Sequence, residues 1–534
     1  MPVKHGKRYY KQMSLEVAVR NPERYEGLLK TFVKFEDEKL DDECILRIYA
    51  QLYLDRAIDA NDLDDSNLNF EYLKDYIPNT KRHNNEWGFP TGYQAAFVRY
   101  LKTLSEFGFI YAQYNEKIKI SQVAKKVIDG TFTLSEAFAL QSMRFWRKSP
   151  YRRVLNDFNY FEFICRAIIK RSFEGKRISY PQLMYSLFSD NGDVNEYLNT
   201  LDNNKIGADL EASYNLAKIN YSEKTAEHQK ISKIETAYKD YGNTVFRVLQ
   251  LTGFITVDYS GMIMLSINRN RLPLLNELLA MNFTISEAAK EDYLLYFNEI
   301  GSCPKKLEKL ILSYRDKEDL STINYKEKIP SILHNYGLDR EKLAEYLISV
   351  SNGEKDNKAF WFIQAPLKFE LLLTLFIYAC YGDEFEYKPN FKCDDSGIPY
   401  SHAPGNIGDI EVFNDKLYWL VEATLISSKN QQINAETVNL FRHIDDRYSC
   451  DKYLTLVAPH VHDDTIMIIK AATLISMVEK KTYGFYSIAQ KTDDFSKTTL
   501  NKDNFKTMKM YSLDFISKIK DFLNDENNQS FLYL

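Results

Sequence analysis

The chain has 534 residues and a formal net charge of −5, with 45% hydrophobic and 27% charged residues. This length exceeds one ordinary domain, and the composition excludes wholesale disorder. The negative net charge excludes a polycation, so any affinity for nucleic acid must come from local basic patches.

The cysteine spacing and the apolar runs indicate the compartment. Six cysteines lie far apart without a CxxC pair, which argues against a disulfide framework and fits a reducing cytoplasm. The first 25 residues are polar and charged and lack the apolar segment of a secretory signal. The longest nearly apolar run, Leu371–Cys380, is about half as long as a bilayer span. We therefore expect a cytoplasmic protein with no membrane partner.

The first half has the apolar periodicity of helices separated by short turns. In Thr91–Phe107 this periodicity predicts a helix with Phe97, Val98, Leu101 and Leu104 facing inward.

Two segments share one order, in which a helix, a glycine and two short strands follow one another. They are Thr91–Phe107, Gly108, Phe109–Tyr111 and Ile118–Ile120 in the first, and Thr244–Leu251, Gly253, Phe254–Val257 and Met262–Leu265 in the second. This order resembles a winged helix, which suggests a nucleic-acid-reading half, although such modules also dock proteins.

Basic residues are the candidate DNA contacts, because Arg and Lys hold phosphates and read guanine edges. The densest group is the segment Gln141–Arg153, with five basic residues, three aromatic residues and no acidic residue. The alternative is a solvated basic surface. The candidates are Lys81, Arg82, Arg99 and Lys102 beside the first unit, Arg144, Arg147, Lys148, Arg152 and Arg153 in the dense segment, and Arg269 and Arg271 after the second unit.

Two predicted strands bring carboxylates together. The runs Gly408–Phe413 and Leu417–Leu425 flank the turn Asn414–Lys416, so they predict a hairpin with Asp409 opposite Glu422 to within a residue or two. Neighbouring carboxylates repel unless a divalent cation lies between them, and hard oxygen ligands suit Mg²⁺. The short pattern resembles the PD-(D/E)xK nuclease hairpin.

Two flanking helices add polar side chains. Ala365–Ile377 is a strongly apolar helix in which Glu370 shares a face with core residues, so we expect it to meet a cation, a metal or a structural salt-bridge partner. In the predicted helix Gln431–Asp446, Glu436 and His443 fall on one side. Both could face the hairpin, and a solvated helix face is the alternative.

These acids, together with Arg442 and His443, resemble the catalytic region of the AlwI-type family of type IIS restriction endonucleases, which includes site-specific nicking relatives. The resemblance extends to Ile433–Ile444, Val457–His460 and Asn21–Arg24. It implies DNA cleavage a few base pairs beyond a short asymmetric site, with Mg²⁺ as cofactor and Mn²⁺ able to substitute. The implied metal ligands are Glu370, Asp409, Glu422 and Glu436, and His443 joins them as a catalytic residue.

One position departs from the nuclease pattern. Thr424 stands two residues after Glu422, where the superfamily usually has the lysine that activates the attacking water. The base therefore stays open between Glu436, Lys429, His443 and a second metal-bound water.

Together these features predict a multidomain α+β chain. It has a helical, winged-helix-like recognition half, a linker and a C-terminal α/β nuclease domain of the PD-(D/E)xK type. The predicted parts are recognition subdomains at 1–160 and 161–285, a helical linker at 286–350 and a catalytic domain at 351–534.

The predicted function is that of a Mg²⁺-dependent type IIS restriction endonuclease acting on double-stranded DNA. One active centre cuts one strand at a time, so double-strand cleavage needs a transient homodimer or a second subunit. The alternative is a non-catalytic winged-helix DNA-binding regulator or repair factor with an inert nuclease-like domain.

Overall fold

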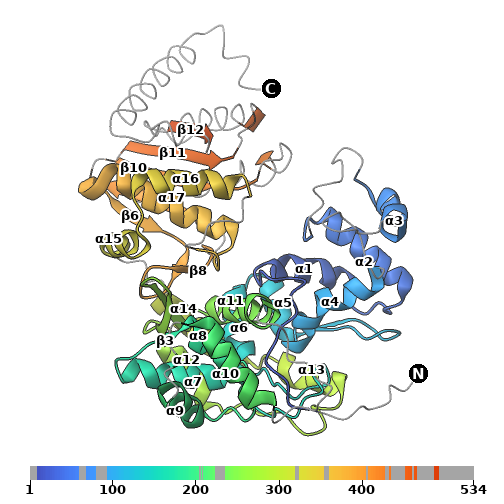
Figure 1. Cartoon of the computed structure of the whole chain (residues 1–534). Helices are drawn as coiled ribbons and strands as arrows, with labels where there is room; N and C mark the ends of the chain where they lie inside the picture. Colours follow the sequence, from blue (N-terminus) through green and yellow to red (C-terminus); the bar gives the residue numbers. More distant parts are fainter. Residues whose placement is uncertain are drawn as a thin grey trace. The chain divides into compact units, whose positions relative to one another are not determined.

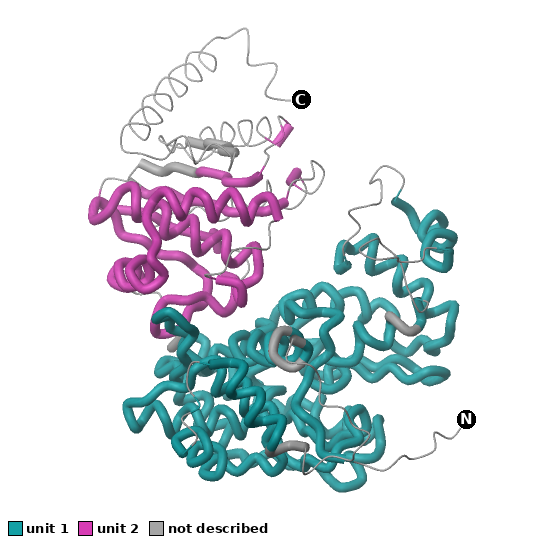
Figure 2. Tube along the Cα trace, viewed as in Figure 1, with its two compact units in different colours: residues 1–318 teal, residues 319–534 magenta. Residues whose placement is uncertain are grey.

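The computed structural model describes residues 9–58, 68–79, 93–203, 206, 209–222, 235–318, 324–353, 360–403, 407–415, 417–426, 432–433, 451–459, 462, 464–465 and 486–491. The chain divides into two compact units, Met1–Glu318 and Asp319–Leu534, which Figure 2 shows in separate colours.

Unit 1 is mainly helical. Its helices are α1 (Arg24–Phe32), η1 (Val33–Phe35), α2 (Asp42–Leu54), α3 (Phe70–Asn79), α4 (Tyr93–Glu106), α5 (Gln122–Ile128), α6 (Leu134–Ser142), α7 (Tyr160–Phe173), α8 (Tyr180–Ser186), α9 (Val194–Asn203), α10 (Leu210–Ser222), η3 (Glu235–Gly242), α11 (Asn243–Leu251), α12 (Leu272–Ala280), α13 (Tyr293–Gly301) and α14 (Lys305–Glu318). Its strands are β1 (Ile110–Tyr111), β2 (Lys119–Ile120), β3 (Ile178–Ser179), β4 (Ile255–Tyr259) and β5 (Ile263–Ile267).

The first predicted helix-and-strand unit is present as α4, β1 and β2. Phe97, Leu101 and Leu104 are buried, as the periodicity predicts. The inward position predicted for Val98 is wrong, because its side chain is 64% exposed. Successive helical residues differ by about 100° around the axis, so Val98 points away from the face that Phe97 buries.

In this first winged-helix-like segment, the residues around Lys39 lie beside the hairpin β1–β2. Lys39 forms an antiparallel bridge with Lys117, just before β2, while Ile110 of β1 pairs with Ile120 of β2. Gly108, with φ at +67°, ends the preceding helix in the left-handed region that glycine adopts at little cost. The hairpin β1–β2 therefore follows α4 directly.

The second predicted winged-helix-like segment, which also lies in unit 1, has the same order of helix and strands. α11 is followed by the antiparallel pair β4–β5, in which Val257 lies opposite Leu265. β3 adds to the other edge of β5, so the strand order is β3-β5-β4. The short segments before both hairpins thus occupy corresponding edges.

Unit 2 is built on a mixed sheet. Its elements are α15 (Tyr325–Tyr336), α16 (Arg340–Ser351), α17 (Ala365–Tyr381), η5 (Gly382–Glu384), β6 (Glu386–Pro389), β7 (Lys392–Cys393), β8 (Pro399–Ser401), β9 (Ile410–Asn414), β10 (Leu417–Ala423), β11 (Asp451–Ala458) and β12 (Tyr486–Lys491). The five-stranded sheet has the order β12-β11-β10-β9-β6. β9 is antiparallel to β6 and β10, whereas β11 is parallel to β10 and β12.

α17 is the core helix of unit 2. It packs against β6, β8 and β10, and α16 lies alongside it (Figure 1). Among the described residues, one helix, Ala365–Glu384, is long and apolar enough to span a membrane by length and composition. Most of it is buried in the fold, and a core helix meets the same criterion.

The charged stretch 286–350, predicted as a linker, is divided between the two units. In unit 1, Arg315 of α14 forms an ion pair with Glu136 of α6. In unit 2, the Tyr325 hydroxyl at the start of α15 donates to the carbonyl of Gly397 at 2.8 Å.

Candidate active site

The predicted carboxylate hairpin is present as β9 and β10. Val421 lies opposite Ile410, and the antiparallel register places Glu422 opposite Asp409, which directly precedes β9. The backbone N–H of Ala423 donates to Asp409 Oδ2 at 2.8 Å. This bond fixes one Asp409 oxygen against the neighbouring strand.

The backbone before Asp409 is held by Asn390, the residue that follows β6. Its N–H donates to the Asp409 carbonyl at 2.8 Å, and its Nδ2 donates to the Gly408 carbonyl at 2.6 Å. A Cβ at Gly408 would lie 2.8 Å from Glu422 Oε1 and would overlap the Leu420 side chain. A larger residue here would therefore force the side chain of Leu420 or Glu422 to shift.

Glu370 reaches the hairpin from α17, and its side chain is buried as the helix pattern predicts. One oxygen, Oε1, lies 2.8 Å from His402 Nδ1. The other, Oε2, is buried and has no hydrogen-bond partner within the described residues.

The electrostatics of Asp409 show that these acids crowd one another. Shielding from water raises the pKa of Asp409 well above its usual value, and the charges of Glu370 and Glu422 raise it further. The Ala423 N–H opposes the shift but does not outweigh it. The site therefore disfavours a full set of negative charges unless a cation offsets them.

Sequence reasoning missed Glu411, which is buried on the same face of β9 as Asp409. Its Oε1 accepts from Lys388 Nζ at 2.8 Å and from Asn390 Nδ2 at 2.9 Å, while its Oε2 is buried and has no hydrogen-bond partner within the described residues. The period of two along a strand places residues 409 and 411 on one face, and this signal could have identified it.

Thr424, which stands at the usual lysine position, is buried. Its Oγ1 accepts from the Ile426 N–H at 3.2 Å, and its own N–H donates to the Val457 carbonyl at 2.9 Å. The hydroxyl is thus engaged with the backbone two residues further on, a local contact that threonine makes at the ends of strands.

The part of the chain that the structure describes contains no group of three Asp, Glu, His or Cys side chains arranged to hold a metal ion. Glu436, Lys429 and His443 lie outside the described residues. Glu370, Asp409 and Glu422 are therefore the part of the predicted ligand set that the structure brings together.

The basic segment Gln141–Arg153 is largely internal, which corrects the expectation of a DNA-facing surface. Arg144 donates to the carbonyls of Ile300 and Ser302 at 2.9 and 2.6 Å, and burial lowers its pKa to about 10. Arg147 is 1% exposed and donates to the Ser189 carbonyl at 2.9 Å. These guanidinium groups bind backbone oxygens that the fold would otherwise leave without partners.

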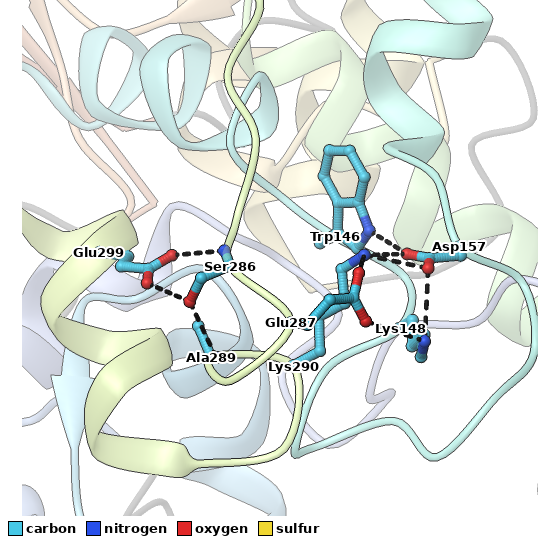
Figure 3. Close-up of polar contacts among 8 residues, drawn as sticks. All are labelled: Trp146, Lys148, Asp157, Ser286, Glu287, Ala289, Lys290 and Glu299. Atoms are coloured by element: carbon cyan, nitrogen blue, oxygen red, sulfur yellow. Dashed lines mark hydrogen bonds and ion pairs between the residues drawn. The ribbon is translucent and has the colours of Figure 1, made fainter.

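Lys148 belongs to an ion-pair network that Figure 3 shows. Its Nζ lies 3.4 Å from Asp157, which also accepts from Trp146 Nε1 at 2.6 Å and pairs with Lys290 at 2.7 Å. Burial alone would raise the pKa of Asp157, but the hydrogen bonds from Lys290 and Trp146 outweigh it and lower that pKa. The network joins the basic segment to the chain before α13.

Two further arginines are also internal. Arg152 forms an ion pair with the fully buried Glu106 at 2.7 Å. Arg271 is 1% exposed and donates to Ser135 Oγ at 3.0 Å and to the Thr252 carbonyl. The side chain of Arg152 is 10% exposed.

The remaining basic candidates differ in exposure. Arg99 on α4 and Arg269 after β5 are exposed, whereas Lys102 and Arg153 are half-buried. Lys81 and Arg82 lie outside the described residues.

The helices α4 and α11 of the two winged-helix-like segments also differ in exposure. Seven of the nine residues of α11 are buried. Its Arg247 donates to Asn243 Oδ1 at 2.7 Å and to Asn21 Oδ1 at 2.9 Å. α4 instead presents Val98 and Arg99 to solvent.

Comparison with known proteins identifies the class as restriction endonucleases. A family model described as AlwI restriction endonuclease matches residues 105–309 and 306–486, which is more than half of the chain. The chain belongs to the AlwI restriction endonuclease family. A search of curated proteins found no match.

Several solved structures resemble the chain at low identity. The small subunit R.BspD6I2 of the heterodimeric restriction endonuclease R.BspD6I is 18% identical, covers 34% of this chain and 95% of its own, and has a TM-score of 0.26. The BpuJ1 endonuclease binding domain, in complex with modified DNA, is 14% identical, covers 39% and 80%, and has a TM-score of 0.27. Restriction endonuclease FokI is 10% identical, covers 94% and 98%, and has a TM-score of 0.24.

Proposed function

We propose that this protein is a type IIS restriction endonuclease that hydrolyses DNA phosphodiester bonds a few base pairs outside a short asymmetric site and depends on Mg²⁺. The observation that carries the proposal is the meeting of Asp409, Glu422 and Glu370 at one end of the β9–β10 hairpin in a chain of this family.

The chemistry of these donors fits a divalent cation. Glu370 Oε2 is buried without a hydrogen-bond partner within the described residues, and the neighbouring charges raise the pKa of Asp409. Carboxylate oxygens are the ligands that Mg²⁺ prefers. We propose Asp409, Glu422, Glu370 and Glu436 as its ligands. When bound, Mg²⁺ would neutralise the charge that develops on the scissile phosphate.

The chain's own residues would orient this site. The Ala423 N–H holds Asp409 Oδ2, and Asn390 holds the backbone of Gly408 and Asp409. Because the Thr424 hydroxyl accepts from the Ile426 N–H, we keep Glu436, Lys429, His443 and a second metal-bound water as the candidates for proton transfer from the attacking water.

We propose that unit 1 recognises DNA through two winged-helix-like subdomains, of which the first presents its helix. Both have a hairpin after the helix; the second has the three-stranded sheet β3-β5-β4, and in the first an isolated bridge from Lys39 to Lys117 adds to the pair β1–β2. α4 exposes Val98 and Arg99, whereas α11 is buried. Arg99, Lys102 and Arg269 are therefore the basic side chains we favour as DNA contacts, together with Lys81 and Arg82.

The test is incubation of the purified protein with plasmid DNA in Mg²⁺ and in EDTA. The proposal expects discrete products in Mg²⁺ alone. Products cut in both strands would point to a transient homodimer or a second subunit, because one centre handles one strand at a time. Tight binding of one sequence without any cleavage would favour a non-catalytic regulator with an inert nuclease-like domain.

A further inference from the structure

Three side chains join the start of α17 to the end of β8. Gln364 is the N-cap residue of α17, yet its side chain makes no capping hydrogen bond. Its Nε2 lies instead 3.1 Å from His402 Nε2. On the other side of the imidazole ring, His402 Nδ1 lies 2.8 Å from Glu370 Oε1.

The donors and acceptors along this chain select one form of the imidazole. A carboxylate oxygen only accepts, so the hydrogen between His402 and Glu370 must lie on Nδ1. The Gln364 amide NH₂ faces Nε2 and donates, so this contact is satisfied when Nε2 accepts. The tautomer with hydrogen on Nδ1 satisfies both contacts.

The consequence for Glu370 is a fixed orientation. With Oε1 held by His402, the carboxylate cannot rotate freely, and its second oxygen, Oε2, remains buried without a hydrogen-bond partner within the described residues. The charge of Glu370 acts on Asp409. Outer partners that hold a ligating carboxylate in this way set its direction and strength toward a cation.

We infer that His402 is a positioning residue that aims the Glu370 carboxylate at the carboxylates of the β9–β10 hairpin, with Gln364 holding the imidazole in the required tautomer. The inference deepens the proposed function and rests on it for the identity of the metal site. His402 contacts the Glu370 carboxylate directly, so its role in the site is exerted through that carboxylate.

A purely structural role is the alternative, in which the contact only joins α17 to β8. The exposure of the pair is informative, because the His402 side chain is 40% exposed whereas that of Glu370 is 5% exposed. The half-exposed imidazole adds little buried apolar area, but its removal leaves the buried Glu370 Oε1 without its hydrogen-bond partner, so the melting temperature of the metal-free protein should fall in either role. The two roles therefore differ in whether metal affinity changes as well.

The experiment measures Mn²⁺ binding to the full chain by isothermal titration calorimetry, with the melting temperature and the Mg²⁺ dependence of plasmid cleavage beside it. The heat that Asp409→Asn removes defines the site. His402→Ala should weaken Mn²⁺ binding at this site by about 10- to 100-fold, and it should lower the melting temperature of the metal-free protein because Glu370 Oε1 loses its partner. Half-maximal cleavage should need correspondingly more Mg²⁺.

A matched pair of amide variants keeps the test independent of the alanine variant. His402→Asn places an NH₂ donor near the position of Nδ1 and should restore most of the affinity, whereas His402→Gln places it near Nε2 and should not. His334→Asn, at an exposed position on α15, is the control and should behave like the unchanged protein.

The outcomes separate this inference from the proposed function. Unchanged Mn²⁺ affinity in His402→Ala, or equal behaviour of His402→Asn and His402→Gln, would overturn the positioning role. Absence of any Mn²⁺ binding that depends on Asp409 would overturn it as well. Weakened Mn²⁺ binding in a protein that never cuts DNA would support the positioning role and reject the nuclease.

Discussion

The close approach of the two strands at Gly408 gives a quantitative prediction for Gly408→Ala. The added Cβ would lie 2.8 Å from Glu422 Oε1 and would overlap the side chain of Leu420, which is fully buried. Forcing one extra carbon into a packed core costs about 1–3 kcal/mol. At about 2–4 °C per kcal/mol for a domain of this size, the melting transition of unit 2 should fall by about 2–12 °C.

The effect on cleavage should exceed the effect on stability. Leu420 is fully buried, so we expect the Glu422 carboxylate to give way, and a misplacement of about 1 Å at a catalytic group can cost about 100-fold in rate. We expect cleavage of a supercoiled plasmid to slow by about that factor at a temperature where the variant is folded.

Gly27→Ala is the matched control. Its Cβ would lie 3.6 Å from Ala57 Cβ, an ordinary contact, and Gly27 lies within α1. Replacing a helical glycine by alanine should stabilise the helix by about 0.5–1 kcal/mol. Wild-type cleavage and melting in Gly408→Ala would refute the close packing of the two strands around Glu422.

Four further substitutions test other parts of the account. Asp409→Asn should abolish cleavage. It should also flatten the pH dependence of melting in the metal-free protein. Because the pKa of Asp409 is raised in the folded state, its contribution to folding stability is complete below about pH 4 and is lost as the pH rises through the raised pKa. Glu370→Gln keeps an oxygen that can accept from His402, so calorimetry should show a near-wild-type melting temperature while plasmid assays show strongly reduced cutting. Arg99→Ala should weaken binding of the target duplex and reduce the slope of log K against log salt by about one, without a change in melting temperature. Arg271→Ala should instead lower the melting temperature, because the guanidinium is buried and hydrogen bonded inside unit 1.

Local patterns predicted the carboxylate hairpin well. The turn after β9 and the alternation along both strands place Asp409 opposite Glu422, and the register of the sheet agrees. The apolar helix that became α17 likewise predicted the burial of Glu370. Both features depend on residues that are near in sequence or that share one helix face, so their periodicity is visible without a structure.

The basic segment shows where such reasoning ends. Arg144 looks like a surface residue in sequence, but its hydrogen-bond partner, the Ile300 carbonyl, lies 156 residues further along the chain. The partner of Glu370, His402, is 32 residues away and belongs to no motif. Charge alone does not tell whether a guanidinium faces DNA or caps buried carbonyls, because that depends on long-range packing.

The most direct test of the central claim is end mapping of plasmid DNA after digestion by the full chain in Mg²⁺. The account predicts ends at one fixed distance of a few base pairs from a single asymmetric sequence, in one strand or both, and none with EDTA or with Asp409→Ala. Ends scattered without a common sequence, cleavage that persists in Asp409→Ala, or a bound duplex that stays intact in Mg²⁺ would contradict it.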